Sequence, residues 1–451
     1  MKKLMVLLLV AVVFVACKNE PEIDYALISG QIENPVDGTV NIYKGKEKIS
    51  EINLDENNAF ADTLRVDRGY YTFVHGRENA SVYLAPGYEL GLTLDTKEFD
   101  ESISFTGPGA EVNNYLAAKY LTDENMSGSV SEVFAMEEQA FLEKVNALKD
   151  AKVKLLDDAQ NIDDEFMVLE SKNLEFEHLT NLQQYPSYHE YFAKKDDFKA
   201  SDDFLKLLDG VDFTNAEYYQ SLSNYKRLVQ NHYSMTLRES DHPAEIFEVL
   251  KTSASEALKT DLARMLNYEV GPNNEHNEAY YNGIMAMSSD EELKAKLTRK
   301  YEKVKLLAKG MPSPVFENYE NHKGGEMSLT DLKGKYVYVD VWATWCGPCK
   351  REIPYLKEVE AKYHNNNIEF VSTSIDKAKD HSAWVEMVKD KELGGIQLFA
   401  DNDWNSKFVT DYAIEGIPRF LLIDPEGNIV TADAPRPSDP KLVKLFEELK
   451  L

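Results

Sequence analysis

The chain is poor in basic residues. Its 451 residues include 50 Lys and Arg against 78 Asp and Glu, which leaves a formal net charge of −28 at pH 7. A surface of this sign repels the phosphate backbones of DNA and RNA. We therefore expect no nucleic-acid partner.

Cysteine is scarce as well, since the chain holds only Cys17, Cys346 and Cys349. No further cysteine can complete a four-cysteine zinc site, and the nine histidines are scattered, with none at ligand spacing near the close pair. We therefore expect no metal and no cofactor. A disulfide across two residues is also a poor structural staple, because the loop-closure entropy it removes grows with loop size. Cys346 and Cys349 are thus predicted to be reactive thiols.

The N-terminus carries a short apolar run, residues 4–16, after two lysines and before Cys17. A bilayer core of about 30 Å needs about 20 apolar residues, so this run fits a secretory signal better than a membrane span. The stretch "FVAC" resembles a bacterial lipobox. This resemblance implies a signal peptide over 1–16, an acylated Cys17 and a tether over 17–24. The alternative is an ordinary signal peptide with an incidental cysteine.

Lipid attachment at Cys17 implies a firm membrane anchor. We expect the protein in the cell envelope of a Gram-negative bacterium, because Lys18 resembles outer-membrane sorting signals. It would face the periplasm or, as the acids after Lys18 suggest, the cell surface. In such a compartment disulfides are common.

The rest of the chain divides into three regions with different sequence patterns. This number agrees with the chain length, which predicts two or three domains. Residues 25–107 alternate apolar and polar positions between turn signals, which predicts a small antiparallel β-sandwich or barrel. Residues 108–310 change to helical periodicity, which predicts a helical domain of about eight to ten helices. After the Pro/Gly linker "KGMPSPVF", residues 311–451 alternate predicted strands and helices, as in an α/β layer fold. The chain is thus predicted to be multidomain.

The segment "VDVWATWCGPCKREIP", residues 339–354, resembles the active-site segment of thioredoxin. Asp340 stands six residues before Cys346, Trp345 directly before it, and "EGIPRF" at 415–420 matches the segment that carries the cis-proline. The 42 residues from Asp376 to Pro418 leave room for an extra helix and strand, which is typical of the TlpA/ResA branch of the AhpC/TSA-related proteins. This resemblance covers 311–451 and implies a thioredoxin-like fold.

The resemblance implies roles for the "CGPC" residues. Cys346 at a helix N-terminus becomes the nucleophile, because the helix dipole favours a thiolate. Cys349 resolves the mixed disulfide. Gly347 lets a substrate chain approach, and Pro348 stiffens the turn.

Asp340 ends an apolar strand, so we expect a raised pKa and proton exchange with Cys349. The alternative is an exposed acid at a strand end. Thioredoxin places a lysine against this aspartate, whereas alignment on "SID" puts Ser372 there. Without a cation the pKa of Asp340 should rise further.

The resemblance also predicts a cis Ile417–Pro418 bond that presents the Ile417 backbone to an extended substrate. We hypothesise that Arg419 lies near Cys346, stabilises its thiolate and favours acidic substrates; the alternative is a solvent-facing strand residue. Trp345 is predicted to line the substrate groove, and Glu352 to lie on a solvated helix face.

These features favour a membrane-anchored thiol–disulfide oxidoreductase that reduces protein disulfides outside the cytoplasm. The resemblance implies apocytochrome c or mispaired proteins as substrates and a DsbD/CcdA-type membrane protein as electron donor. One alternative is a non-catalytic binding or scaffold lipoprotein. Another is a peroxiredoxin-type peroxidase, although its Pro-x-x-x-Thr-x-x-Cys loop would need proline where Val339 stands.

Overall fold

The computed structural model describes residues 23–451 apart from 196 and 273. The predicted signal peptide, Cys17 and most of the tether therefore lie outside the described residues. The chain forms two compact units, 1–229 and 230–451. The boundary falls within helix α8 (Ser223–Glu239), so the helices of the predicted middle domain belong to both units.

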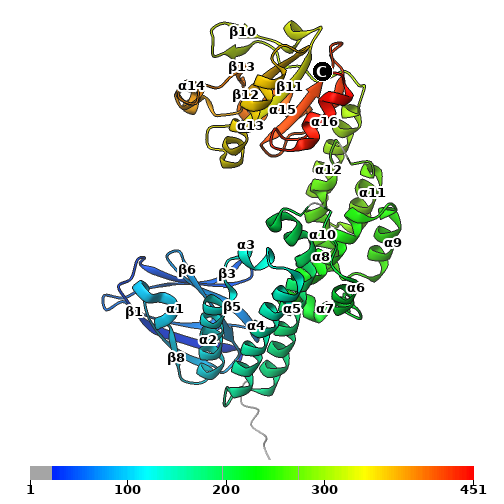
Figure 1. Cartoon of the computed structure of the whole chain (residues 1–451). Coiled ribbons are helices and arrows are strands. Elements are labelled where there is room, and N and C mark those ends of the chain that lie inside the picture. Colours follow the sequence, from blue (N-terminus) through cyan, green and yellow to red (C-terminus); the bar gives the residue numbers. More distant parts are fainter. Residues whose placement is uncertain (1–22, 196, 273) are drawn as a thin grey trace, which may run out of the picture. The chain divides into compact units, whose positions relative to one another are not determined.

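The first unit begins with two four-stranded sheets that share one hydrophobic core (Figure 1). One sheet has the order β4 (Ala59–Arg65), β1 (Tyr25–Glu33), β7 (Glu89–Asp95) and β8 (Ser104–Thr106). The other has the order β3 (Glu47–Asn53), β2 (Thr39–Lys44), β5 (Gly69–His75) and β6 (Glu78–Leu84). Alternate residues of these strands fill the core, which explains the period of two.

The predicted β-sandwich is confirmed, and its strands pair antiparallel except for β1 and β7, which pair in parallel. After β4 the chain crosses to the other sheet for β5 and β6 and returns on the far side of β1. Periodicity reports which residues face the core but not the direction of the neighbouring strand. The region is therefore a mixed β-sandwich.

Helices follow the sandwich in both units. In the first unit α1 (Phe99–Ser102) precedes the last sandwich strand, and the helices after that strand are α2 (Ala110–Ser127), α3 (Val130–Phe134), α4 (Glu138–Asp158), α5 (Asp164–Ala193), α6 (Asp202–Leu205) and α7 (Ala216–Ser221). In the second they are α9 (Pro243–Ser253), α10 (Glu256–Leu266), α11 (Asn277–Met287) and α12 (Glu291–Val304). The helical middle region is confirmed, and the described part also contains short helices such as α3, α6 and α7 that are too brief to show a helical period.

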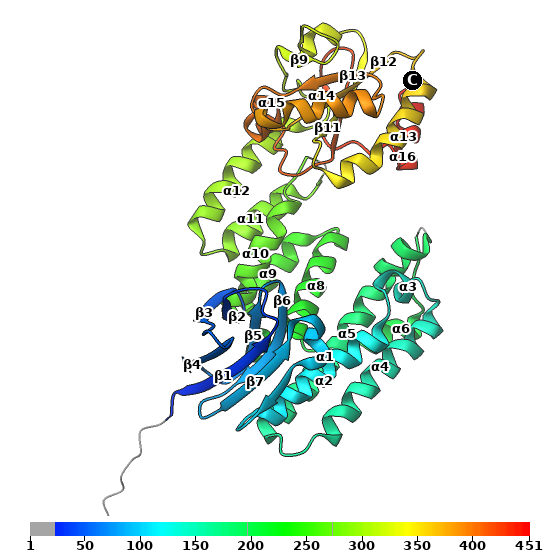
Figure 2. The same ribbon diagram turned by 90° about the vertical axis from the view of Figure 1, so that its left-hand side faces the viewer.

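The second unit ends in a seven-stranded sheet flanked by helices (Figure 2). Its order is β10 (Glu326–Met327), β9 (Tyr319–Asn321), β13 (Ile396–Phe399), β12 (Ile368–Ser374), β11 (Tyr336–Trp342), β14 (Arg419–Ile423) and β15 (Ile429–Thr431). The helices are α13 (Gly347–Tyr363), α14 (His381–Asp390), α15 (Lys407–Asp411) and α16 (Pro440–Glu448). Strands β11, β12 and β13 are parallel, and the predicted α/β layer fold is confirmed.

The two faces of the central strand β11 are both buried, and this decides where the chemistry lies. Val337, Val339 and Val341 pack in one cluster with α14 and α15, while Tyr338 packs in another with α13 and α16. Because successive side chains of a strand point to opposite faces, Asp340 shares the α13 face with Tyr338.

Helix α12 is joined to the sheet domain of the same unit. Lys300 Nζ lies 2.8 Å from Glu415 Oε2, and Lys303 Nζ donates to the carbonyl oxygen of Thr410 at 2.6 Å. Leu307, just after α12, is part of the sheet's hydrophobic core. Among the described residues, no helix is both long and apolar enough to traverse a lipid bilayer.

Candidate active site

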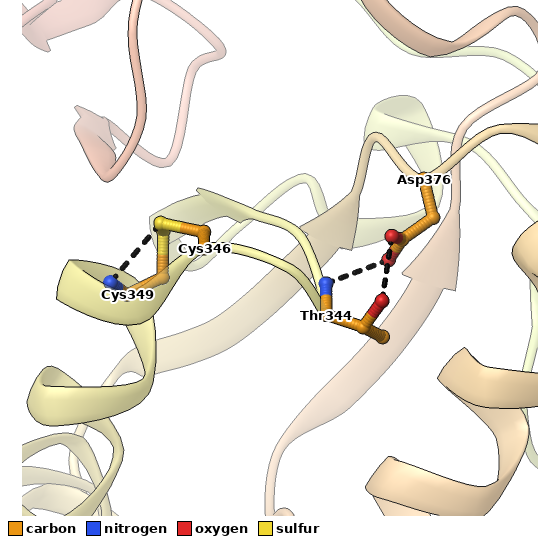
Figure 3. The surroundings of a disulfide bond; sticks show 4 residues. All are labelled: Thr344, Cys346, Cys349 and Asp376. Carbon is orange, nitrogen blue, oxygen red and sulfur yellow. Dashed lines mark hydrogen bonds between the residues drawn. A yellow bond between two sulfur atoms is a disulfide. The ribbon is translucent and has the colours of Figure 1, made fainter. Parts of the chain in front are cut away.

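Cys346 and Cys349 form a disulfide at the start of α13 (Figure 3). Cys346 is the N-cap residue of this helix, and the backbone N–H of Cys349 donates to Cys346 Sγ at 3.1 Å. The predicted helix N-terminus is therefore confirmed. Both cysteines are only 4% exposed in this oxidised state, so burial does not distinguish them. Their positions in the helix do distinguish the two cysteines, because only the Cys346 sulfur accepts a hydrogen bond from a free N–H of the first helical turn.

The loop that enters the cysteine pair is held by the fully buried carboxylate of Asp376, directly after β12. Asp376 accepts hydrogen bonds from Thr344 N at 2.9 Å and from Thr344 Oγ1 at 2.7 Å (Figure 3). A third bond comes from Ser374 Oγ at 2.7 Å. The loop after β11 is thereby fastened to the end of the neighbouring parallel strand. Sequence reasoning used Asp376 only for spacing; its position at the carboxyl end of a parallel strand beside β11 was the usable signal.

Asp340 is 9% exposed and lies on β11 opposite Ser372 of β12. Burial raises its pKa to about 8, with a further rise from the negative charges of Glu352 and Glu360 and an opposing effect of the Ser372 hydrogen bond. The prediction of a raised pKa is confirmed, and the alternative of an exposed acid is wrong. Two acids on α13, Glu352 and Glu360, contribute to the shift in addition to the apolar strand from which the sequence predicted it.

The Ile417–Pro418 peptide bond is cis, as predicted. It directly precedes β14, whose first residue, Arg419, stands opposite Val341 of β11. The Arg419 guanidinium does not stand free, since its Nη1 lies 2.8 Å from Asp433 Oδ1. Arg419 is therefore not an unpaired cation available to the Cys346 thiolate, and its side chain is partly exposed.

Arg419 and Asp433 also line a cavity of about 470 Å³ in the second unit. Its other walls come from the helical segment of that unit and include Arg238, Tyr268 and His276. The cavity carries both signs of charge, because Arg238 is paired with Glu269. This arrangement gives no preference for acidic substrates, and that part of the Arg419 hypothesis lacks support from the geometry.

The surface around the cysteines is apolar and open. Trp345 is 55% exposed, with its ring centre 6.4 Å from that of Trp404, whereas Trp342 is buried in the core. Gly347 and Pro348 are exposed at the first turn of α13. No atom lies within 4 Å of where a Cβ on Gly347 would stand, which leaves space for another chain.

The redoxin family model matches residues 308–445 of this chain. The thiol–disulfide oxidoreductase ResA of Bacillus cereus (strain ZK / E33L) is 32% identical over 124 residues, which are 28% of this chain and 67% of that protein. ResA of Bacillus subtilis (strain 168) is 28% identical over 124 residues and is covered to 66%. This chain belongs to the ResA-like thiol–disulfide oxidoreductase family.

A solved structure of a putative thiol–disulfide oxidoreductase from Bacteroides vulgatus is 51% identical, covers 31% of this chain and 90% of its own, and has a TM-score of 0.28. These similarities lie in the C-terminal third of the chain. The sequence-based identification of that third as related to ResA and TlpA is confirmed.

One expectation for the ResA-like domain is wrong. Glu352 was predicted on a solvated helix face, but it is only 8% exposed and accepts hydrogen bonds from the N–H and hydroxyl of Ser438, each at 3.0 Å. The segment before α16 folds over this turn of α13 and buries it. Lys350 and Arg351, by contrast, are exposed.

Proposed function

We propose that this ResA-like protein is a lipid-anchored enzyme of the bacterial cell envelope that reduces protein disulfides with the Cys346–Cys349 dithiol. The observation that carries the proposal is the position of Cys346 at the N-cap of α13 with the buried Asp340 behind the pair. A helix N-terminus favours the thiolate needed for attack, and a carboxyl group with a pKa near neutrality suits proton transfer.

The reaction begins with attack of the Cys346 thiolate on one sulfur of the substrate disulfide, which releases the first substrate thiolate and leaves a mixed disulfide. Cys349 then gives its proton to Asp340, in the fraction of molecules in which this group of pKa about 8 is ionised, and attacks Cys346 Sγ. The second substrate thiolate leaves, and the enzyme carries the disulfide of the present structure. Two electrons have passed from the dithiol to the substrate.

The rest of the proposal concerns where the protein works and what it meets. An acylated Cys17 would hold it on the outer membrane, facing the periplasm or the cell surface. A DsbD/CcdA-type membrane protein would return the dithiol to its reduced form, and apocytochrome c or mispaired envelope proteins would be substrates. Labelling with a radioactive fatty acid tests the anchor, since Cys17→Ser should abolish the label.

Insulin reduction by dithiothreitol tests the chemistry with the full chain in detergent. We expect the wild type to accelerate reduction and Cys346→Ser to abolish the acceleration. An inert wild type would refute the proposal and favour a binding or scaffold role for the sandwich and helices. Consumption of hydrogen peroxide at a comparable rate would instead favour a peroxidase.

A further inference from the structure

A small cavity lies behind Cys349, between α13 and the sheet. It holds about 10 Å³ of space, enough for about one water molecule. Its lining includes Cys349, Asp340 and Trp342 from the active-site segment, Gln397 from β13 and Glu360 from the fourth turn of α13. The cavity thus connects the resolving cysteine with a second carboxyl group that the mechanism has not used.

Three residues of this lining each carry a buried polar atom that has no hydrogen-bond partner among the described residues: Asp340 Oδ1, Trp342 Nε1 and Gln397 Oε1. All three side chains belong to residues that are at least nine-tenths buried. Buried polar groups in native proteins are nearly always satisfied, by protein or by ordered water. One donor and two acceptors around a space of this size match the needs of one bound water.

Glu360 is half-buried, and its carboxylate rests against two consecutive glycines. A Cβ on Gly394 would stand 2.2 Å from Glu360 Oε2, and one on Gly395 would stand 2.9 Å from Glu360 Oε1. Side chains at these two positions would therefore displace the carboxylate from its place beside the cavity. Because glycine has no side chain, Gly394 and Gly395 leave room for the Glu360 carboxylate next to β13, the strand that follows them.

The charges around Glu360 make it a suitable proton acceptor. Burial raises its pKa to about 7, while Lys357 on its own helix and Lys323 from the turn between β9 and β10 act in the opposite direction. From β11, Asp340 faces it, with a pKa raised to about 8. Glu352, the other acid that raises the pKa of Asp340, accepts a hydrogen bond from the backbone N–H of Ser438. The proton affinities of Asp340 and Glu360 differ by only about tenfold, so a proton can move between them readily.

We propose that Glu360 is the outlet of a proton relay that runs from Cys349 through Asp340 and one water to the solvent. This inference rests on the proposed function. While Cys349 sulfur attacks Cys346 Sγ and the substrate thiolate leaves, the Cys349 proton passes to the Asp340 carboxylate. Asp340 passes a proton through the water to the Glu360 carboxylate, which releases it to bulk solvent. Asp340 is then ionised again. Glu360 touches neither the substrate nor the sulfurs and acts only through Asp340, so it is a positioning residue.

The test is the pH dependence of the resolving step in the full chain, measured in single turnover between about pH 5 and 9, where both carboxyl groups titrate. Glu360→Gln should slow this step by about threefold to tenfold and move the midpoint of the rate profile to lower pH, since Asp340 loses a negative neighbour. Glu358→Gln, the same charge change at an exposed site on α13, should match the wild type.

A second variant reaches the same carboxylate without removing it. Gly394→Ala should displace Glu360 through the Cβ contact and slow the step in the same way. Glu360→Asp should restore part of the rate. Identical rate profiles for Glu360→Gln and Glu358→Gln in an active enzyme overturn the relay alone, whereas a wild type that reduces no disulfide overturns the proposed function with it.

Discussion

The buried carboxyl group of Asp340 should make the ResA-like domain less stable as the pH rises from 4 to 7. Burial raises its pKa to about 8, well above the ordinary value of an aspartate, so the folded state retains a proton that the unfolded state loses. Wherever the folded state binds more protons than the unfolded state, the free energy of unfolding falls with increasing pH. Asp340→Asn removes this dependence, because an amide does not titrate.

The size of the effect follows from the shift. Between pH 4 and pH 7 the unfolded carboxyl group is mostly ionised and the folded one mostly protonated, so the two states differ by about one bound proton over about three pH units. At 1.36 kcal/mol per unit, the variant should gain about 4 kcal/mol over the wild type between pH 4 and pH 7. Any cost of burying the amide is the same at both values and cancels from this difference.

Urea unfolding followed by tryptophan fluorescence measures this difference in the free energy of unfolding. The oxidised protein is used, because its cysteines do not titrate. All four tryptophans of the chain, at 342, 345, 384 and 404, lie in the ResA-like domain. The signal therefore reports unfolding of that domain, and linear extrapolation provides its free energy. Glu358→Gln, an exposed acid on α13, serves as the control.

The reasoning would be refuted if the difference in the free energy of unfolding between Asp340→Asn and wild type stayed constant from pH 4 to pH 7. It would mean that Asp340 is ionised in the folded protein despite its burial. A carboxylate that stays ionised throughout this range is a weak base, so the role of Asp340 as acceptor of the Cys349 proton near neutral pH would lose its support, and the relay through Glu360 with it.

Three further outcomes test the site. Cys349→Ser should accumulate a mixed disulfide between Cys346 and the substrate, visible on a non-reducing gel; free substrate thiol in its place would contradict the assigned order of attack. Trp345→Ala should raise KM for a protein substrate several-fold while Tm stays constant, because the ring is more than half exposed; an unchanged KM would remove it from the groove. Thr344→Val should lower the free energy of unfolding by about 1.5–3 kcal/mol through loss of a hydrogen bond to the buried Asp376, whereas Thr344→Ser should retain most of it, and equal losses in both variants would point to packing instead.

Much of the active site could be predicted because its determinants are contiguous in the chain. An apolar strand followed by Cys346, Gly347 and Pro348 places the first cysteine at a helix N-terminus through local backbone chemistry alone. The burial of Asp340 followed from the apolar strand around it, whereas the cis bond before Pro418 followed from the resemblance to thioredoxin. In the sandwich, alternation predicted which residues fill the core, since side-chain direction in a strand depends only on parity.

The features that the sequence did not predict involve interaction partners that are remote in the chain. Glu352 is buried by Ser438, 86 residues away, and the Arg419 guanidinium is held by Asp433 across the β14–β15 hairpin. The parallel pairing of β1 with β7 depends on the path of the chain between the two sheets. No periodicity reports such pairings, because a residue's own pattern is the same whichever partner covers it.

By itself, the sequence determined the identity of the reactive pair, the helix that begins at Cys346 and the apolar strand that buries Asp340. Only the tertiary structure decided what surrounds that acid: Glu360 from one helix, Gln397 from a third strand, and two glycines that leave room for a carboxylate. Strand and helix patterns arise from neighbours along the chain. The environment that sets a proton's affinity arises from neighbours in space, brought together when the sheet and α13 pack.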